Sequence, residues 1–493
     1  MVRWVLLSFL FFTVSGYGQP HFDFNPDCRK AYEAIVQLRL DEGSRLLEAE
    51  KKNDADNLIP VLLDNYIDFF KLFFNEDPAL YQAAKGRLDQ RLARLSAGPE
   101  SSPFYLFARS IIHFQWAAIR IKFGNNLSAG LDFRRSFLES QECREKFPSF
   151  GPATMLSGAM KVVAGTIPDG YKWLSNLLGI RGSVREGMAD LENFLRLGDE
   201  WSVLYRDEAT FYYLYLRFYI LNQHRQVFEY IRQHQLDVRN NYLFAYVDAN
   251  LSINDQRSEA ARMVIQGRNK DAGYLEMPVW DLEMGYACLN HLDAEAPVYL
   301  ERFLARFRGR FYVKDALQKL SWYYYLAGDQ RLADSLRRRV LRQGSAESDA
   351  DRQAVKEARS GVWPDKTLLR ARLLTDGGYY EDALRSLQGV GTSAYTRPED
   401  RCELSYRLGR IYDGLGRKDE AITAYLTTIK TGEHLKEYYA ARAALQAGEI
   451  YESRGDLERA MGFYQKCLSM KDHDFKNSLD QRAKAGIARC EGE

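Results

Sequence analysis

The chain has 493 residues, 46% hydrophobic and 27% charged, which is the composition of a folded protein and excludes an intrinsically disordered one. Its length far exceeds one ordinary globular core, although a stacked array of repeats can reach it because each unit packs only on its neighbours. Lys and Arg number 68 against 67 Asp and Glu, and this balance argues against a general binder of nucleic acid or acidic membranes.

The N-terminus has the pattern of a secretory signal. Arg3 supplies a positive charge, the run from Trp4 to Val14 is apolar, and Ser15 to Gly18 provides small residues. We therefore predict a signal peptide over residues 1–18, with cleavage before Gln19, in an exported protein that is periplasmic, secreted or envelope-associated. Retention of this run as an uncleaved anchor is the alternative. No second long apolar run follows, so we predict no membrane span in the mature chain.

Residues 19–200 are predicted to form an irregular α-helical region. Phe104 to Ile119 is a long apolar stretch with helical spacing. Between Gly165 and Gly182 the sequence predicts a helix that begins at a proline and ends in a glycine turn, and an amphipathic helix is expected from Val184.

Residues 201–341 are predicted to form degenerate helical hairpins. Two aromatic clusters lie here, over 211–219 and 322–325. We expect both to be buried between neighbouring hairpins, because consecutive aromatic residues point to all sides of a helix. The alternative is that a few of these rings line a groove for a ligand.

Residues 342–363 interrupt the pattern and are predicted to be an insert or linker. Turn-forming residues open the segment and Gly361 to Pro364 closes it. The charged stretch from Asp351 to Arg359 is expected to form a short, exposed helix. This insert explains why Ala333 and Ala383, which occupy equivalent positions, lie farther apart than Ala383 and Ala421 do.

Residues 364–493 contain the clearest internal repeat. Two copies follow each other at one constant offset, and a fixed period of this size indicates stacked helical hairpins. The recurring residues are Leu408, Gly409, Tyr412, Gly416, Ala421 and Tyr425 in the first copy, and Ala447, Gly448, Tyr451, Gly455, Ala460 and Tyr464 in the second.

The repeated residues suggest how each hairpin is held together. Gly409 and Gly448 would let the first helix of each hairpin, helix A, lie close to the second, helix B. Gly416 and Gly455 would end helix A in a left-handed conformation, which glycine adopts most easily. Ala421 is expected at the closest crossing of the helices, with Tyr425 filling the gap one turn later.

This pattern resembles the tetratricopeptide repeat, specifically at 402–435 and 441–474 and less closely at 314–347 and 364–397. The period is longer than the roughly 34 residues of that family, and about one extra helical turn in each unit would account for the difference. The segment from 150 to 200 also resembles the tetratricopeptide-39 family, in which a proline-led helix precedes a Gly-Leu-x-x-Leu helix. The resemblance implies an all-α solenoid of helical hairpins, and it implies that helix A lines the concave side.

The sequence contains little that indicates catalysis. The seven histidines form no metal-binding pair, and we found no phosphate-binding loop and no nucleophile motif. The six cysteines are widely spaced, and we expect buried free thiols. We therefore predict no enzyme, no metal and no cofactor, although residues brought together from distant positions could still form an active site.

The repeat phase predicts which helix A positions face outward on the concave side. These positions combine aromatic residues with both signs of charge, as surfaces that bind proteins do. The candidate partner-binding residues are Trp322, Tyr325, Arg372, Tyr406, Arg410, Asp413, Arg442, Glu449 and Glu452.

The sequence therefore predicts an exported, non-catalytic scaffold or adaptor that binds a protein or peptide on its concave surface and does not bind nucleic acid. The alternative is a carrier that holds an apolar or glycan ligand in an aromatic-lined pocket of the first half. The identity of the partner does not follow from the sequence.

Overall fold

The computed structural model describes residues 18–166 and 182–492. Within these ranges every regular element is a helix, and the one β-type contact is an isolated bridge between His21 and Asn57. The predicted signal peptide and the predicted proline-led helix between Gly165 and Gly182 lie largely outside the described residues. None of the described helices combines the length and apolar character that crossing a bilayer requires.

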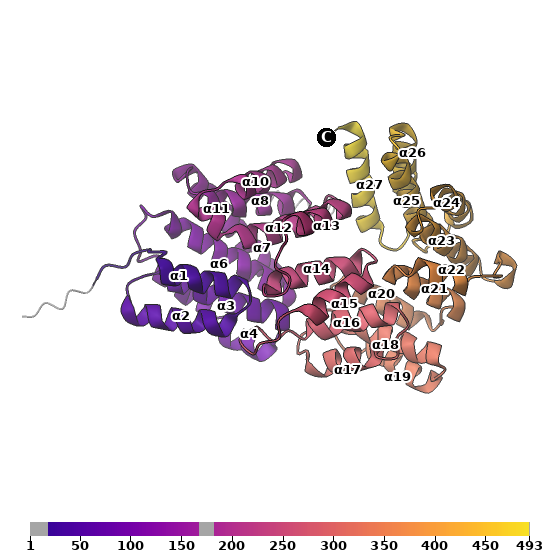
Figure 1. Cartoon of the computed structure of the whole chain (residues 1–493), viewed down its shortest axis with the longest axis horizontal. Coiled ribbons are helices and arrows are strands. Elements are labelled where there is room, and N and C mark those ends of the chain that lie inside the picture. Colours follow the sequence, from indigo (N-terminus) through magenta and orange to yellow (C-terminus); the bar gives the residue numbers. More distant parts are fainter. Residues whose placement is uncertain (1–17, 167–181, 493) are drawn as a thin grey trace, which may run out of the picture.

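The first helices form the irregular N-terminal region (Figure 1). They share one continuous core with the middle of the chain, in which buried residues run from Phe24 to Leu373. The helices are α1 (Pro26–Val36), α2 (Leu40–Asn53), α3 (Ile59–Asn75), α4 (Pro78–Ala84), α5 (Arg87–Leu95), α6 (Pro103–Lys122), α7 (Asn126–Lys146), α8 (Gly151–Gly165), α10 (Val184–Arg196) and α11 (Glu200–Leu204).

The middle of the chain is a series of helical hairpins. From α14 to α20 each helix packs on the next one in sequence, α13 packs on α12, and α12, α14, α16 and α18 also pack on one another in that order. The helices are α12 (Arg206–Tyr219), α13 (His224–Gln233), α14 (Tyr242–Asn254), α15 (Ser258–Gly267), α16 (Val279–Asn290), α17 (Ala296–Arg306), α18 (Val313–Ala327), α19 (Gln330–Val340) and α20 (Asp349–Ser360).

The C-terminal hairpins stack in the same way, with α21, α23, α25 and α27 forming one row. Their buried residues from Cys402 to Ala483 form a core of their own. The helices are α21 (Lys366–Gly377), α22 (Tyr380–Ser386), the 3-10 helix η2 (Thr392–Ala394), α23 (Pro398–Gly414), α24 (Lys418–Gly432), α25 (Tyr439–Ser453), α26 (Leu457–Ser469) and α27 (Lys476–Glu491). The protein is thus an all-α solenoid of helical hairpins with a less regular N-terminal half.

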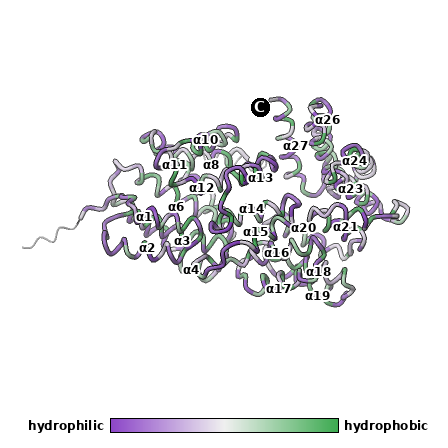
Figure 2. The backbone as a smooth tube through the Cα atoms, in the orientation of Figure 1, coloured by the Kyte–Doolittle hydropathy of each residue, from purple (hydrophilic) through white to green (hydrophobic). Residues whose placement is uncertain are grey.

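Hydrophobic and hydrophilic positions are mixed along the helices of the whole chain (Figure 2). This mixing is expected where each helix buries one face and exposes the other. Five of the six cysteines are buried within this core and Cys490 is half-buried, all as free thiols.

The glycines of the repeat have the two roles that the sequence predicts. A Cβ atom at Gly409 would lie 2.5 Å from the ring of Tyr425, and one at Gly448 would lie 2.6 Å from the ring of Tyr464. Helix A can therefore approach helix B only without a side chain there. Gly416 and Gly455 both have a φ of 77°, the left-handed conformation that ends a helix.

The insert is helical, but the expectation of an exposed helix is wrong. Asp351 and Ala354 of α20 are fully buried, and α20 packs against α18 and α19. The carboxylate of Asp351 accepts hydrogen bonds from the backbone N–H groups of Tyr312 (2.8 Å), Lys314 (3.1 Å) and Asp315 (3.1 Å). It thereby satisfies donors that the first turn of α18 leaves without partners. The insert is thus an integral part of the fold.

Candidate partner-binding surface

The predicted binding residues lie on the row of A helices, but they are not equally accessible. Trp322 and Tyr406 are 2% and 1% exposed, so the expectation that these two face outward is wrong. The ring of Tyr406 packs against Tyr438 and Tyr439, with ring centroids 5.9 and 5.3 Å apart. Residues 438–439, at the start of α25, therefore cover a position that is free when a single hairpin is considered alone.

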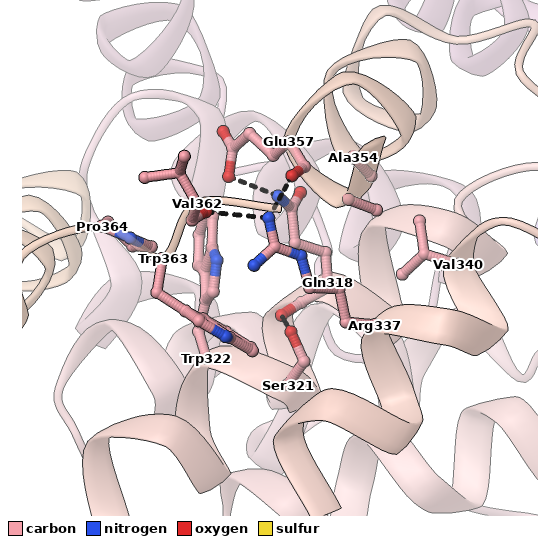
Figure 3. A pocket seen from close by; sticks show the side chains of 11 residues that line it. Gln318, Ser321, Trp322, Arg337, Val340, Ala354, Glu357, Val362, Trp363 and Pro364 are labelled. Carbon is pink, nitrogen blue, oxygen red and sulfur yellow. Dashed lines mark hydrogen bonds between the residues drawn. The ribbon is translucent and has the colours of Figure 1, made fainter. Parts of the chain in front are cut away.

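Trp322 lies where the insert meets α18 (Figure 3). The cations of Lys319 and Arg372 lie 4.4 and 4.6 Å from the Trp322 ring centroid. Tyr325 stacks on Trp363 at 4.4 Å, and its hydroxyl donates to the backbone oxygen of Pro364 (3.1 Å).

The small cavity beside these residues also lies within the packed junction. The Arg337 side chain crosses it and donates to the Val362 carbonyl at 2.8 Å. The cavity volume is about 10 Å³, room for one water molecule and not for a glycan. This end of the predicted site therefore serves packing.

Asp413 and Glu452 occupy equivalent positions in the two repeats and make equivalent contacts within their hairpins. Asp413 pairs with Lys418 and accepts a long hydrogen bond from the hydroxyl of Tyr425 (3.4 Å). Glu452 accepts from the Tyr464 hydroxyl, and its carboxylate also pairs with Arg489 of α27 at 2.7 Å. Both carboxylates are thus already engaged by the chain itself.

Three of the remaining predicted residues belong to a cluster of arginines on the A helices, which we call the arginine face, and the fourth, Glu449, pairs with a member of that cluster. The sequence predicts Arg372, Arg410 and Arg442, and the structure adds two more. The arginine face comprises Arg372 of α21, Arg407 and Arg410 of α23, Arg442 of α25 and Arg482 of α27.

Within the arginine face, Arg410 and Arg442 differ from the rest. Arg407 pairs with Glu403 at 2.8 Å and Arg482 with Glu449 at 3.1 Å, whereas the Arg372 guanidinium lies within 3.6 Å of Glu357. Arg410 donates a hydrogen bond to the Tyr406 hydroxyl at 3.0 Å. Among the described residues, no carboxylate forms an ion pair with Arg410 or Arg442.

Nearby titratable groups report a positive potential at the arginine face. Burial raises the pKa of Tyr406, but Arg410, Arg442 and Arg407 outweigh burial, so its pKa lies below the ordinary value. Burial and the neighbouring charge of Arg442 together lower the pKa of Arg482 to about 10. These two shifts indicate positive charge around Tyr406 and Arg482, whereas the pKa of Arg410 is raised, against burial, by Tyr406 and Asp376.

Two acids within this surface are held in their ionised form by the arginines. Burial opposes ionisation of Asp376, yet Arg407, Arg410 and Arg372 together hold its pKa below the ordinary value. The pKa of Glu449 is likewise lowered, against burial, by Arg482 and Arg442. Both carboxylates therefore remain ionised, and each offsets part of the positive charge of the arginine face.

Sequence reasoning missed Arg407, Asp376 and Arg482. Asp376 follows Arg372 by four residues and Arg407 precedes Arg410 by three, so both share a helix face with a predicted residue. That spacing could have identified them. Arg482 lies in α27, beyond the second repeat copy, where the repeat phase offers no equivalent position.

The arginine face lies close to a segment that is distant in sequence. Asn222, in the turn between α12 and α13, donates to Glu449 at 2.9 Å, and Arg489 donates to the Leu221 carbonyl at 3.4 Å. Figure 1 shows α27 on the side of α26 nearer to α13. The C-terminal hairpins thus curl back toward the middle of the chain.

The described residues contain no group of three or more His, Cys, Asp or Glu side chains arranged to hold a metal ion. What the arginine face offers chemically is charge and hydrogen-bond donors. Guanidinium groups in a fixed arrangement bind carboxylates through charge-assisted hydrogen bonds, which are stronger than neutral ones.

Comparisons with known proteins identify the C-terminal hairpins. Residues 403–430 and 441–474, which cover most of α23–α24 and α25–α26, match the family model for the tetratricopeptide repeat. A search of curated proteins found no match.

Two solved structures are similar to the chain. The first is the TPR domain of P58(IPK), at 14% identity over 87% of this chain and 97% of that chain, with a TM-score of 0.23. The second is the APC/C hetero-tetramer Cut9–Hcn1, at 11% identity over 92% of this chain and 95% of that chain, with a TM-score of 0.28.

Proposed function

We propose, from the premise that residues 403–430 and 441–474 are tetratricopeptide repeats, that the chain is a non-catalytic scaffold for protein–protein interaction. The partner would present an acidic segment to the arginine face. The observation that carries this proposal is that, among the described residues, no carboxylate forms an ion pair with Arg410 or Arg442, whose charges act on Asp376 and Glu449 without such a contact. A carboxylate from a partner would supply the missing ion pair.

The proposed surface also explains why the arginine face is built on several helices. Side chains from α21, α23, α25 and α27 are held in place by the packing of their hairpins, so little conformational entropy is lost when a partner binds. Specificity would follow from the spacing of the guanidinium groups along the row of A helices. Rim charges would mainly affect the rate of association.

A capture experiment with matched baits tests this proposal. The full chain is immobilised as wild type, as Arg410→Gln/Arg442→Gln, and as Arg417→Gln/Arg459→Gln. The control pair removes the same total charge from exposed arginines that pair with Glu420 and Asp456 on the B-helix side. We expect proteins with acidic segments to be retained by the wild type and the control and lost from the first variant. Equal retention by all three baits would contradict the proposal.

We also propose that the protein acts after export and that the signal peptide over residues 1–18 is removed. The support is the sequence pattern of Arg3, the apolar run to Val14 and the small residues before Gln19. The intact mass of the protein recovered from the envelope or periplasmic fraction should correspond to a chain that begins at Gln19. A mass that includes residues 1–18 would indicate the uncleaved anchor instead.

A further inference from the structure

A second polar site lies in the middle of the chain, at Glu283 of α16. Glu283 is buried, with only 3% of the residue exposed to solvent. Oε1 accepts a hydrogen bond from Nδ2 of Asn250 at 2.7 Å, whereas Oε2 is buried and has no hydrogen-bond partner among the described residues. A buried carboxylate oxygen without a hydrogen-bond donor destabilises the fold, because the atom loses its hydrogen bonds to water and gains none from the protein.

Four tyrosines lie near this carboxyl group. Tyr215 and Tyr219 come from α12, Tyr246 from α14, and Tyr312 from the turn before α18, and the charge of Glu283 acts on all four phenols. The Tyr215 ring centroid lies 5.7 Å from that of Tyr219 and 6.5 Å from that of Tyr246.

The site borders solvent on one side and is fixed on the other. Tyr219 and Tyr312 are 44% and 42% exposed. The hydroxyls of Tyr215 and Tyr219 donate to Oδ1 of Asn250, at 3.1 and 3.2 Å. Asn250 thereby orients both rings and the Glu283 carboxyl group together.

Other acids near Tyr312 already have partners, which distinguishes Glu283 from them. Asp351 caps α18, and Glu76 accepts from Arg310 N–H at 3.1 Å and pairs with Lys122 at 3.0 Å. Asp315 accepts from the Tyr286 hydroxyl at 2.6 Å. No lysine or arginine forms an ion pair with Glu283 within the described ranges, and none lies over the rings of the four tyrosines.

We propose that Glu283 and the tyrosines at 215, 219, 246 and 312 form a binding site for an organic ammonium group. Oε2 of Glu283 would accept a hydrogen bond from the N–H of the ligand, and the tyrosine rings would contact its positive charge through their faces. A divalent metal does not fit, because Ca²⁺ takes six or more oxygen ligands and Mg²⁺ prefers an octahedral set. This site is independent of the arginine face, which attracts charge of the opposite sign.

The state of the free acid makes cation binding at this site depend on pH. Burial raises the pKa of Glu283 to about 7, and the hydrogen bond from Asn250 only partly opposes this effect. The facing titratable groups are the four tyrosines together with Tyr286 of α16. A bound ammonium group would stabilise the ionised carboxylate, so binding near neutral pH releases protons.

Calorimetric titration of the full chain with n-butylammonium chloride tests the proposal, with n-butanol as the neutral ligand of similar shape. We expect the ammonium ion to bind at least tenfold more tightly than the alcohol. Its affinity should fall about tenfold from pH 8 to pH 6, following the ionised fraction of a group with a pKa of about 7. If the two ligands bind equally at pH 8, the proposal is wrong.

Substitutions at the site show where the ligand binds, and a control substitution at another buried acid shows whether a loss of affinity comes from altered folding. Glu283→Gln, which preserves shape, should lower n-butylammonium affinity at least tenfold, and Tyr219→Leu about two- to fivefold. The control is Glu208→Gln, since Glu208 is also a buried acid but accepts hydrogen bonds from Tyr32 (2.7 Å), Tyr66 (2.9 Å) and Tyr212 (2.6 Å). Unchanged affinity in Glu283→Gln would overturn the proposal.

Two sources could supply an ammonium group, a free amine or a lysine side chain of a bound protein. Titration with Nα-acetyl-lysine methylamide distinguishes them. If this compound binds at least tenfold more tightly than n-butylammonium, contacts with the peptide backbone contribute and a protein is the source. Equal or weaker binding assigns the site to a free amine.

Discussion

Tyr406 connects the packing of the C-terminal repeats to the arginine face. Its ring lies between α23 and the start of α25, and its hydroxyl accepts the hydrogen bond that holds Arg410. The side chain is 1% exposed and belongs to the core of the last repeats. Its influence on binding would therefore act through Arg410 and through the stability of the hairpins.

Replacement of Tyr406 separates these two roles. We expect Tyr406→Ala to lower the free energy of unfolding by about 3 kcal/mol, because a large aromatic side chain is removed from the core. Tyr406→Phe keeps the ring and should cost about 1 kcal/mol, the typical value of one hydrogen bond. Chemical denaturation measures both. A Tyr406→Ala variant as stable as the wild type would show that the ring is not part of the core.

Glu283 should make the stability of the protein depend on pH. Its pKa is about 7 in the folded chain and 4.5 ordinarily, so between these values the folded state binds more protons than the unfolded state. The free energy of unfolding therefore falls as the pH rises through this window, by on the order of 3 kcal/mol.

The matching measurement compares denaturation of the wild type and Glu283→Gln at pH 5 and pH 8. The neutral glutamine has no such proton linkage, so the variant should gain stability relative to the wild type at pH 8. If the difference between the two proteins is the same at both pH values, Glu283 has an ordinary pKa.

At the scale of the element, the close approach of helix A to helix B depends on one glycine in each repeat, Gly409 in the first and Gly448 in the second. Gly448 faces the ring of Tyr464, whose other side lies against Gly486 of α27. Gly462, on the exposed side of α26, has open space around it. The same substitution should therefore have opposite effects at these two helical positions.

We predict that Gly448→Ala lowers the melting temperature, since the added Cβ would lie 2.6 Å from the Tyr464 ring. Gly462→Ala should raise stability by about 0.5–1 kcal/mol, because alanine has the higher helix propensity. Thermal denaturation of the two variants compares them directly. A stabilising effect at both positions would mean that the hairpin has room between α25 and α26.

The repeat phase predicted these hairpin contacts because they are local. Gly409, Gly416 and Ala421 act within one hairpin, and the next hairpin repeats all three at the same spacing. The burial of α20 could not be predicted in this way. Asp351 belongs to no repeat. Its side chain can cap α18 only because α20 is held against that helix. The position of α20 in turn depends on the path of the chain to α21, which packs on α16.

At the scale of the whole molecule, the curvature of the array decides which surfaces meet. Asn222 and Glu449 are 227 residues apart in sequence and 2.9 Å apart in space. Small rotations between successive hairpins add up along a solenoid, so such a contact depends on every unit between its ends. No local pattern encodes it. The repeat phase identified Arg410 and Arg442 but not Arg482, which lies beyond the second repeat copy.

The arginine face extends along the row formed by α21, α23, α25 and α27, so its shape depends on how these hairpins stack. Arg410 and Arg442 lie on neighbouring A helices. Because neither forms an ion pair with a described carboxylate, we expect their replacement to affect binding more than stability. Arg442 makes no side-chain hydrogen bond or ion pair within the described part of the chain, and its charge lowers the pKa of Arg482. Removing Arg442 should leave the melting temperature unchanged or slightly raised.

The dissociation constant of the captured partner for the purified full chain tests the central claim most directly. For Arg410→Gln/Arg442→Gln we predict a dissociation constant at least tenfold higher than for the wild type, because each lost charge-assisted hydrogen bond weakens binding by about 1.5–3 kcal/mol. The Arg417→Gln/Arg459→Gln control should bind like the wild type. An unchanged dissociation constant in a folded Arg410→Gln/Arg442→Gln protein would contradict the assignment of the arginine face as the binding surface.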